Sequence, residues 1–200
     1  KRKRKNCESN QSMEMYLNLK EIKKGYQAIK QMAIEAFDKK DYELTLSKID
    51  DAVNFVQQFN WIYTDNELEN ILCAISNQKL SVNSDYYPNQ SRVVLFDDWC
   101  TSYVLALQYI EALSLQFSEI LYCTAREIES MSYPNILDKV SKFKNVSIVV
   151  IPPNLTRFER TQQIIDTIIN FSPSKLFLHI GYNSPVVLAL YSLPKGITRY

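Results

Sequence analysis

Short apolar runs alternate with helical patterns from Arg92 onward, and this alternation constrains the fold more than any other feature of the sequence. Each of the first four runs is five or six residues long, the length of a strand that is buried on both faces. Strands that are joined by helices through short loops form a parallel sheet with right-handed crossovers. We therefore expect an α/β, Rossmann-like parallel sheet with helices on both faces. The predicted strands cover residues 92–96, 119–123, 146–151, 175–180 and 197–200.

A helical region precedes this sheet, with apolar residues at helical spacing from residue 16 to about residue 80. The polar break 38–41 separates its first two helices, and Asp41 is a suitable N-cap for the second. The spacing of residues 33–52 resembles one tetratricopeptide-like hairpin, and a single repeat has to pack on a neighbour to bury both its faces. Thr64 and Glu67 have the spacing of a capping box, which predicts a third helix.

These patterns divide the chain into four segments. Residues 1–15 are a basic and polar tail, residues 16–80 the helical region, residues 81–91 a polar linker and residues 92–200 the α/β domain. The last predicted strand is unfinished at Tyr200, so we expect a truncated α/β domain that belongs to a larger protein.

The composition argues against several classes of function. The formal net charge is +1, so no global field directs the protein to nucleic acid, and the basic run Lys1–Lys5 is expected to be a solvated tail. The four cysteines lie far apart and the chain has one histidine, which disfavours a zinc site. The sequence has no secretory signal and no apolar stretch of about 18 residues. We expect a reducing, cytoplasmic protein without a bound metal.

Glycine is scarce, since the chain has three: Gly25, Gly181 and Gly196. A Walker loop needs two glycines before a lysine, and a dinucleotide fingerprint needs three at close spacing. Neither motif can be assembled from these positions, so we expect no ordinary phosphate cradle in this part of the protein.

Polar, reactive side chains cluster at the ends of two predicted strands. Ligands of open parallel sheets bind beyond the carboxyl ends of the strands, where the strand order reverses. With the order 3-2-1-4, strands one and four are neighbours at that point. Asp97, Asp98 and His179 are therefore candidate catalytic residues. The loops that follow supply candidate substrate-binding residues, namely Trp99, Thr101, Gly181, Tyr182 and Asn183.

Each candidate also has a structural alternative. An aspartate at position 97 or 98 could act as a base, bind sugar hydroxyls or hold a metal, or it could cap the next helix through amides near Ser102. His179 could act as a base or be a satisfied structural residue. Gly181 could admit a ligand or form a turn. Cys100 is expected to be an inert thiol, because no histidine lies close to it in sequence.

The segment Arg92–Asp98 resembles the first strand and the acidic pair of response-regulator receiver domains. In those domains the acidic pair helps to hold magnesium beside a phosphorylatable aspartate at the end of strand three. Ile151 stands about where that aspartate would be, so the resemblance implies a degenerate receiver without a phosphoacceptor. Together with the helical hairpin, such a domain would be a non-catalytic interaction module.

A longer part of the chain, about residues 26–200, resembles the N-terminal half of bacterial GT-B glycosyltransferases of the polysaccharide type. Many members have a glycine-rich turn after strand one, which this chain lacks. The segments that carry the resemblance are Tyr63–Leu68, Phe96–Trp99, Leu107–Leu113, Glu119–Cys123, Leu178–Gly181 and Lys195–Tyr200.

The resemblance implies two Rossmann-like domains, of which the first binds mainly the glycan acceptor and the second mainly the nucleotide-sugar donor. Residues 92–200 would be the first domain, with Asp97, Asp98 and His179 on the acceptor wall of the cleft. The missing donor-binding domain would be its partner, no metal or bound cofactor is expected, and this chain alone should be inactive. Peripheral association with a membrane is a further expectation.

Three functions therefore stay open at the level of the sequence. The first, and the main expectation, is the acceptor-binding portion of a glycosyltransferase that transfers sugar to a glycan or polysaccharide. The second is the interaction module built on a degenerate receiver. The third is a different α/β enzyme that uses Asp97, Asp98 and His179 as an acid–base set.

Overall fold

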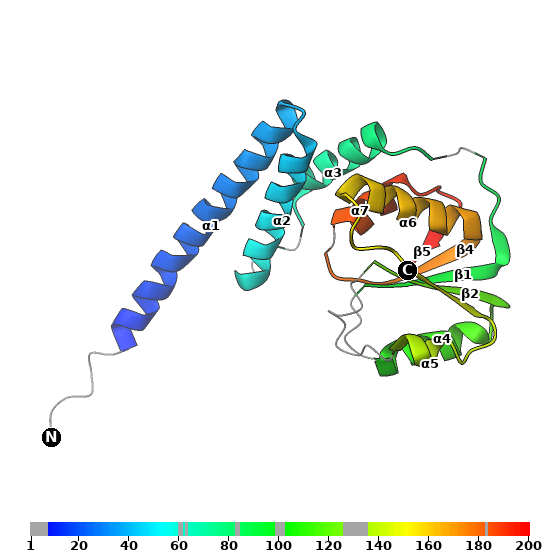
Figure 1. Ribbon diagram of the computed structural model, residues 1–200. Helices are drawn as coiled ribbons and strands as arrows, with labels where there is room; N and C mark the ends of the chain where they lie inside the picture. The colour runs from blue at the N-terminus through cyan, green and yellow to red at the C-terminus, as the bar shows by residue number, and fades with distance from the viewer. Residues whose placement is uncertain are drawn as a thin grey trace, which may run out of the picture. The chain divides into compact units, whose positions relative to one another are not determined.

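A computed structural model of the chain has its helices and strands in the order that the sequence predicts (Figure 1). Its backbone divides into two compact units, Lys1–Leu72 and Cys73–Tyr200, and the boundary falls inside helix α3 (Asn66–Lys79). The residues that the structure describes are 8–59, 62, 64–82, 85–98, 103–125, 136–182 and 184–200.

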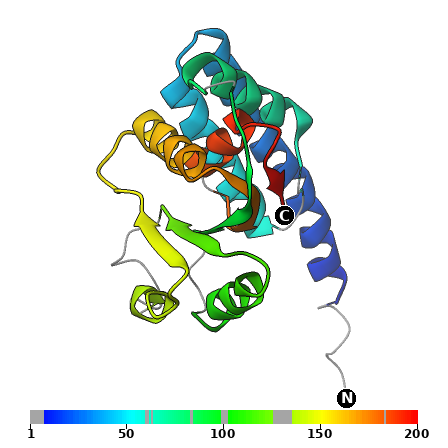
Figure 2. The same cartoon turned by 90° about the vertical axis from the view of Figure 1, so that its right-hand side faces the viewer.

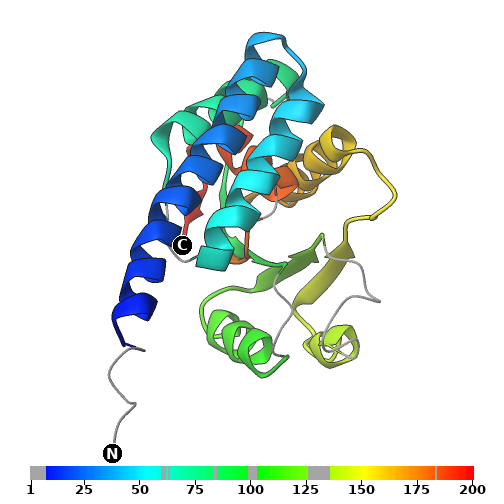
Figure 3. The same ribbon diagram turned by 90° about the vertical axis from the view of Figure 1, so that its left-hand side faces the viewer.

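Unit 1 contains a helical hairpin. Helices α1 (Glu8–Asp38) and α2 (Tyr42–Phe59) pack side by side, and the break between them lies where the sequence predicts it (Figure 3). The Asp41 carboxylate accepts a hydrogen bond of 3.1 Å from the amide of Leu44, so Asp41 is the predicted cap of α2. Mostly small and branched side chains fill the interior of the hairpin, and its buried residues are Tyr26, Ala33, Ala36, Thr45, Leu46, Ile49 and Ala52.

The start of α3 differs from the prediction, because the capping box of Thr64 and Glu67 is wrong. Asp65 is the cap, and its Oδ1 accepts hydrogen bonds of 3.1 and 3.3 Å from the second and third amides of the helix. Other hydrogen bonds of this carboxylate explain why Asp65 is the cap. The carboxylate also accepts hydrogen bonds from Tyr26 Oη at 2.6 Å and from Lys30 Nζ at 2.8 Å, and both donors are on α1. Glu67 pairs with Lys30 at 2.9 Å instead of reaching back to the backbone.

Unit 2 contains a parallel sheet, which has five strands in the part of the chain that the structure describes. The strand order is β3-β2-β1-β4-β5, which confirms the predicted order of the first four strands and the Rossmann-like α/β fold. Strand β1 begins three residues before the predicted apolar run, within the segment 81–91 that the sequence marks as a linker. The strands are β1 (Asn89–Asp97), β2 (Glu119–Thr124), β3 (Val146–Val150), β4 (Pro173–His179) and β5 (Thr198–Arg199).

Helices cover both faces of this sheet (Figures 1 and 2). Helices α4 (Tyr103–Ser114) and α5 (Ile136–Val140) pack on the face to which Val93 and Leu95 of β1 point. Helices α6 (Arg157–Phe171) and α7 (Ser184–Ser192) pack on the opposite face, to which Val94 and Phe96 point. Because side chains alternate along a strand, the last residue of β1, Asp97, belongs to the face of α4 and α5.

The thiol of Cys123 in β2 lies in the sheet core and is fully buried. Burial raises the pKa of Cys123 to about 12, and the charge of Asp98 adds to the effect. We expect iodoacetamide at neutral pH to leave Cys123 unmodified in the folded protein and to modify it in denaturant, because the reactive thiolate is both rare and enclosed. Peptide mass spectrometry gives the comparison, with the half-buried Cys73 as the reference thiol. Equal labelling of Cys123 and Cys73 in the folded protein would contradict the packing of β2.

Candidate active site

The sheet places the carboxyl ends of β1 and β4 next to each other, as the strand order predicts. Asp97 and His179 are register partners across the two strands. The amide of Asp98 donates a hydrogen bond of 3.1 Å to the carbonyl oxygen of His179, so the pairing continues one residue beyond β1. Two of the predicted catalytic side chains are thus brought together from positions 82 residues apart.

Asp97 and His179 form a hydrogen-bonded pair. His179 Nδ1 lies 2.9 Å from Asp97 Oδ1, and the side chains of Asp97 and His179 are 0% and 21% exposed. A buried carboxylate can only accept in this bond, so the imidazole carries its proton on Nδ1. The second ring nitrogen, Nε2, then has a lone pair that can accept a proton from a bound molecule. The arrangement has the chemistry of a general base that a carboxylate orients.

Tyr122 fixes the carboxylate from its other side. Its hydroxyl donates to Asp97 Oδ2 at 2.8 Å, and the tyrosine is fully buried. Asp97 therefore accepts hydrogen bonds from two side chains and has no surface with which to touch a substrate, so we assign it a positioning role. The sequence does not single out Tyr122, because it stands inside an apolar strand and has the pattern of an ordinary core residue.

The environment of the Asp98 carboxylate differs from that of Asp97. It is 9% exposed, and its Oδ1 accepts a hydrogen bond of 3.1 Å from the amide of Ala125, immediately after β2. This contact ties the end of β1 to the end of β2, which is a structural role other than the helix cap that the sequence offers. The amides near Ser102, which the sequence offers as the capped group, lie outside the described residues.

Tyr109 of α4 is a further aromatic neighbour of His179, and it is not among the predicted site residues. The centroids of the two rings are 6.0 Å apart and the ring planes are inclined by 47°. Tyr109 is 36% exposed, whereas Ala106, Ile110 and Leu113 on the same helix are buried against the sheet. A signal was present in the sequence, since an aromatic residue stands off the apolar stripe of the helix that follows the first strand.

The predicted substrate-binding residues are placed in part. Gly181 and Tyr182 stand two and three residues after His179 and are half-buried. None of the described glycines has a positive φ, so the turn at Gly181 uses a conformation that other residues also adopt. Among the described side chains, no three His, Cys, Asp or Glu residues gather as they would around a metal ion. Trp99, Cys100, Thr101 and Asn183 lie outside the described residues.

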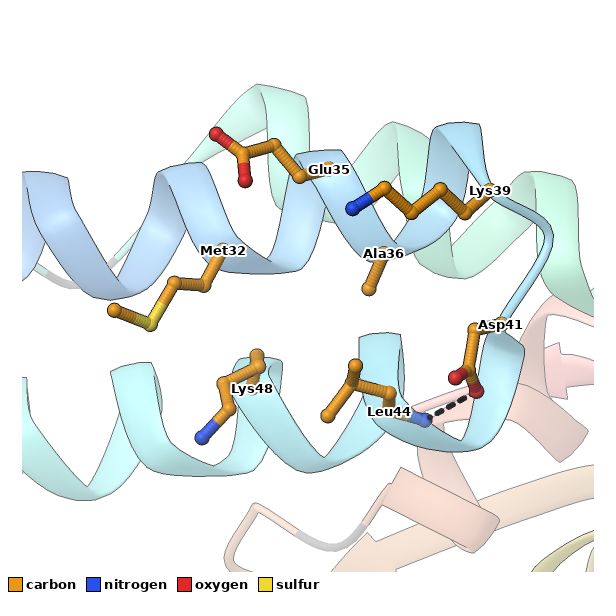
Figure 4. A pocket seen from close by; sticks show the side chains of 7 residues that line it. All are labelled: Met32, Glu35, Ala36, Lys39, Asp41, Leu44 and Lys48. Atoms are coloured by element: carbon orange, nitrogen blue, oxygen red, sulfur yellow. Dashed lines mark hydrogen bonds between the residues drawn. The ribbon is translucent and has the colours of Figure 1, made fainter.

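A concave feature lies in unit 1, between α1 and α2 (Figure 4). This open hollow has a volume of about 420 Å³. Two of its charged residues serve the hairpin itself, since Asp41 caps α2 and Lys48 pairs with Asp51 at 2.8 Å. It therefore offers weaker support for chemistry than the pair of Asp97 and His179. The lining residues are Met32, Glu35, Ala36, Lys39, Asp41, Leu44 and Lys48.

Comparison of the chain with models of protein families, with characterised proteins and with solved structures gives no match. Within the described residues, no helix combines the length and the apolar character that crossing a bilayer requires.

Proposed function

We propose that residues 92–200 form the acceptor-binding portion of a glycosyltransferase, in which His179 removes the proton of the attacking sugar hydroxyl. The observation that carries the proposal is the bond between His179 Nδ1 and the buried carboxylate of Asp97, at the ends of two adjacent parallel strands. That position is where open α/β sheets bind ligands, because the strand order reverses between β1 and β4.

The reaction follows from the protonation state of the pair. The acceptor oxygen forms a bond to the anomeric carbon of the donor sugar while its proton passes to Nε2 of His179. The bond from that carbon to the nucleotide diphosphate breaks, and the diphosphate leaves with the electron pair. The Asp97 carboxylate stabilises the imidazolium that results. A single displacement of this kind inverts the configuration at the anomeric carbon.

Two further observations support an acceptor rather than a donor role for this part. The three glycines of the chain do not form a phosphate-binding loop, so a nucleotide diphosphate has no ordinary cradle here. The resemblance of residues 26–200 to N-terminal GT-B domains assigns the donor to a second domain. The rival interaction module gives no reason for a buried carboxylate to orient the chain's one histidine.

The proposal can be tested on the ring of His179, which is the one histidine of the chain and gives a single set of imidazole resonances. The protein is titrated with methyl pyranosides of gluco, galacto, manno and N-acetylglucosamine configuration, and separately with UDP-glucose and GDP-mannose. We expect at least one pyranoside to shift the imidazole resonances saturably in the millimolar range, and the nucleotide sugars to do so weakly or not at all.

Two outcomes count against the proposal. If no pyranoside shifts the His179 resonances, the site does not bind an acceptor, and the interaction module becomes the better account. If a nucleotide sugar binds more tightly than every pyranoside, the donor is held by this part and the assignment of the acceptor wall is wrong. Transfer from a nucleotide sugar by this chain alone would also contradict the proposal.

A further inference from the structure

Among the described residues, the sheet face that carries Asp97 and His179 is closely covered at β1 and β2 and less closely covered at β4. Under α4 and α5, the side chains of Val93, Leu95 and Tyr122 are at most 1% exposed. On β4 the same face bears Phe177 and His179, which are half-buried. Within the described part of the chain, burial on this face therefore decreases from β1 to β4, and the imidazole of His179 lies where it is lower.

Tyr109 stands beside this less buried part of the face. It belongs to α4, which provides the cover, yet its ring is 36% exposed and lies beside the imidazole of His179. A tyrosine that served only to pack α4 on the sheet would be enclosed, as Ile110 is with 0% exposure. Two neighbouring and partly exposed rings thus place an apolar group next to a basic nitrogen.

The chemistry of these two rings matches one face of a pyranose. Sugar rings present axial C–H groups on one face and hydroxyls around the rim, and an aromatic ring binds the C–H face by dispersion and burial. A ring hydroxyl of a sugar that lies on Tyr109 would be directed to the neighbouring imidazole. Such placement holds the acceptor hydroxyl and the imidazole of His179 in a fixed mutual orientation. Orientation of reacting groups is a main source of rate enhancement in enzymes.

We propose that Tyr109 is the acceptor-binding residue that holds a pyranose ring against His179. This inference rests on the proposed function, since it names the group that positions the acceptor for the base. It also specifies the acceptor as a molecule that presents an intact pyranose ring at its reacting end. The phenol hydroxyl is not required, because the ring face makes the contact.

Two variants and a matched control test the assignment with the pyranoside that gives the largest shift of the His179 resonances. Tyr109→Ala is expected to weaken its binding about tenfold, and Tyr109→Phe, which keeps the ring, to change it by less than about threefold. The control Tyr87→Ala removes a tyrosine that is 83% exposed and should leave binding unchanged. Circular dichroism verifies that each variant is folded.

The outcomes separate this inference from the function on which it rests. If the pyranoside binds Tyr109→Ala as tightly as the unmodified protein, Tyr109 does not hold the acceptor, while the role of His179 stands. If Tyr109→Phe loses binding as fully as Tyr109→Ala, the hydroxyl rather than the ring face is the binding element, and the assignment fails in that form. Absence of any pyranoside shift in the unmodified protein would overturn the proposed function and this inference together.

Discussion

Replacement of His179 by alanine is expected to lower the rate of sugar transfer by about 10²- to 10⁴-fold, the range that a general base contributes. The loss should appear in kcat more than in KM, because Nε2 acts on the proton that moves in the transition state. The rate is measured as the release of nucleoside diphosphate by the full protein that the gene encodes, over a range of pH.

Asp97→Asn is the matched test of the positioning role. An asparagine amide can turn its N–H toward Nδ1 of His179, so the imidazole proton moves to Nε2 and the base is lost although the ring stays in place. We expect a loss of rate of similar order, about 10²-fold or more, with little change in stability. Tyr122→Phe keeps both members of the pair and should lower the rate less than about tenfold.

Activity of His179→Ala within threefold of the unmodified protein would rule out His179 as the base.

The second large effect is on stability. Asp65→Ala should lower the free energy of unfolding by about 2–4 kcal/mol, because it removes the cap of α3 and takes one acceptor from each of two part-buried donors on α1. Those donors are the Tyr26 hydroxyl, at 2.6 Å, and the Lys30 ammonium, at 2.8 Å. Chemical denaturation followed by circular dichroism measures the change.

The pH dependence of this effect follows from the shifted groups. Burial favours a higher pKa for Asp65, but hydrogen bonds from Lys30, Tyr26 and the helix amide outweigh it and lower the pKa below 3.8. Burial opposes the charge of Lys30, yet its bonds to Asp65 and Glu67 raise the pKa above 10.5. A carboxyl group whose pKa is lowered by folding stabilises the folded state at pH values above its ordinary pKa. An ammonium group whose pKa is raised by folding stabilises the folded state at pH values below its ordinary pKa. The difference between unmodified protein and Asp65→Ala should therefore be constant from about pH 4 to 10 and shrink as the pH falls further.

Asp51→Ala is the control for this measurement. Asp51 pairs with Lys48 at 2.8 Å, but its side chain is 50% exposed, so its loss should change stability by less than about 0.5 kcal/mol. A loss smaller than about 1 kcal/mol for Asp65→Ala would show that the contacts around Asp65 do not hold α1 to the start of α3.

Most of the sheet could be predicted because hydrophobic periodicity is a local signal. The helix Arg157–Phe171 has the predicted bounds, since Thr156 and Glu159 form a capping box at its start and Ser172 adopts φ 53° at its end. The strand order followed from the rules for parallel connections, and these rules placed Asp97 beside His179 without any motif.

The features that could not be predicted from the sequence depend on contacts between residues far apart in the chain. Tyr122 reaches Asp97 because Leu95 and Tyr122 are register partners, and a slip of one residue would turn that hydroxyl to the opposite face. Asp65 rather than Thr64 caps α3 because Tyr26 and Lys30, 39 and 35 residues away, add partners to its carboxylate. Aspartate is also the stronger N-cap residue of the two, so part of this choice is a local preference. The exposure of Tyr109 depends on how closely its part of the sheet is covered.

The central place of β1 also has a consequence for synthesis on the ribosome. Its neighbour β2 follows within about 30 residues, whereas its other neighbour, β4, carries the histidine 82 residues after Asp97. The nascent chain therefore holds a strand with one paired and one unpaired edge while α5, β3 and α6 are being made. An apolar edge of this kind is a template for pairing with another chain. We expect chains that stop before residue 173 to aggregate, and the base and its orienting carboxylate to assemble only after β4 has been made.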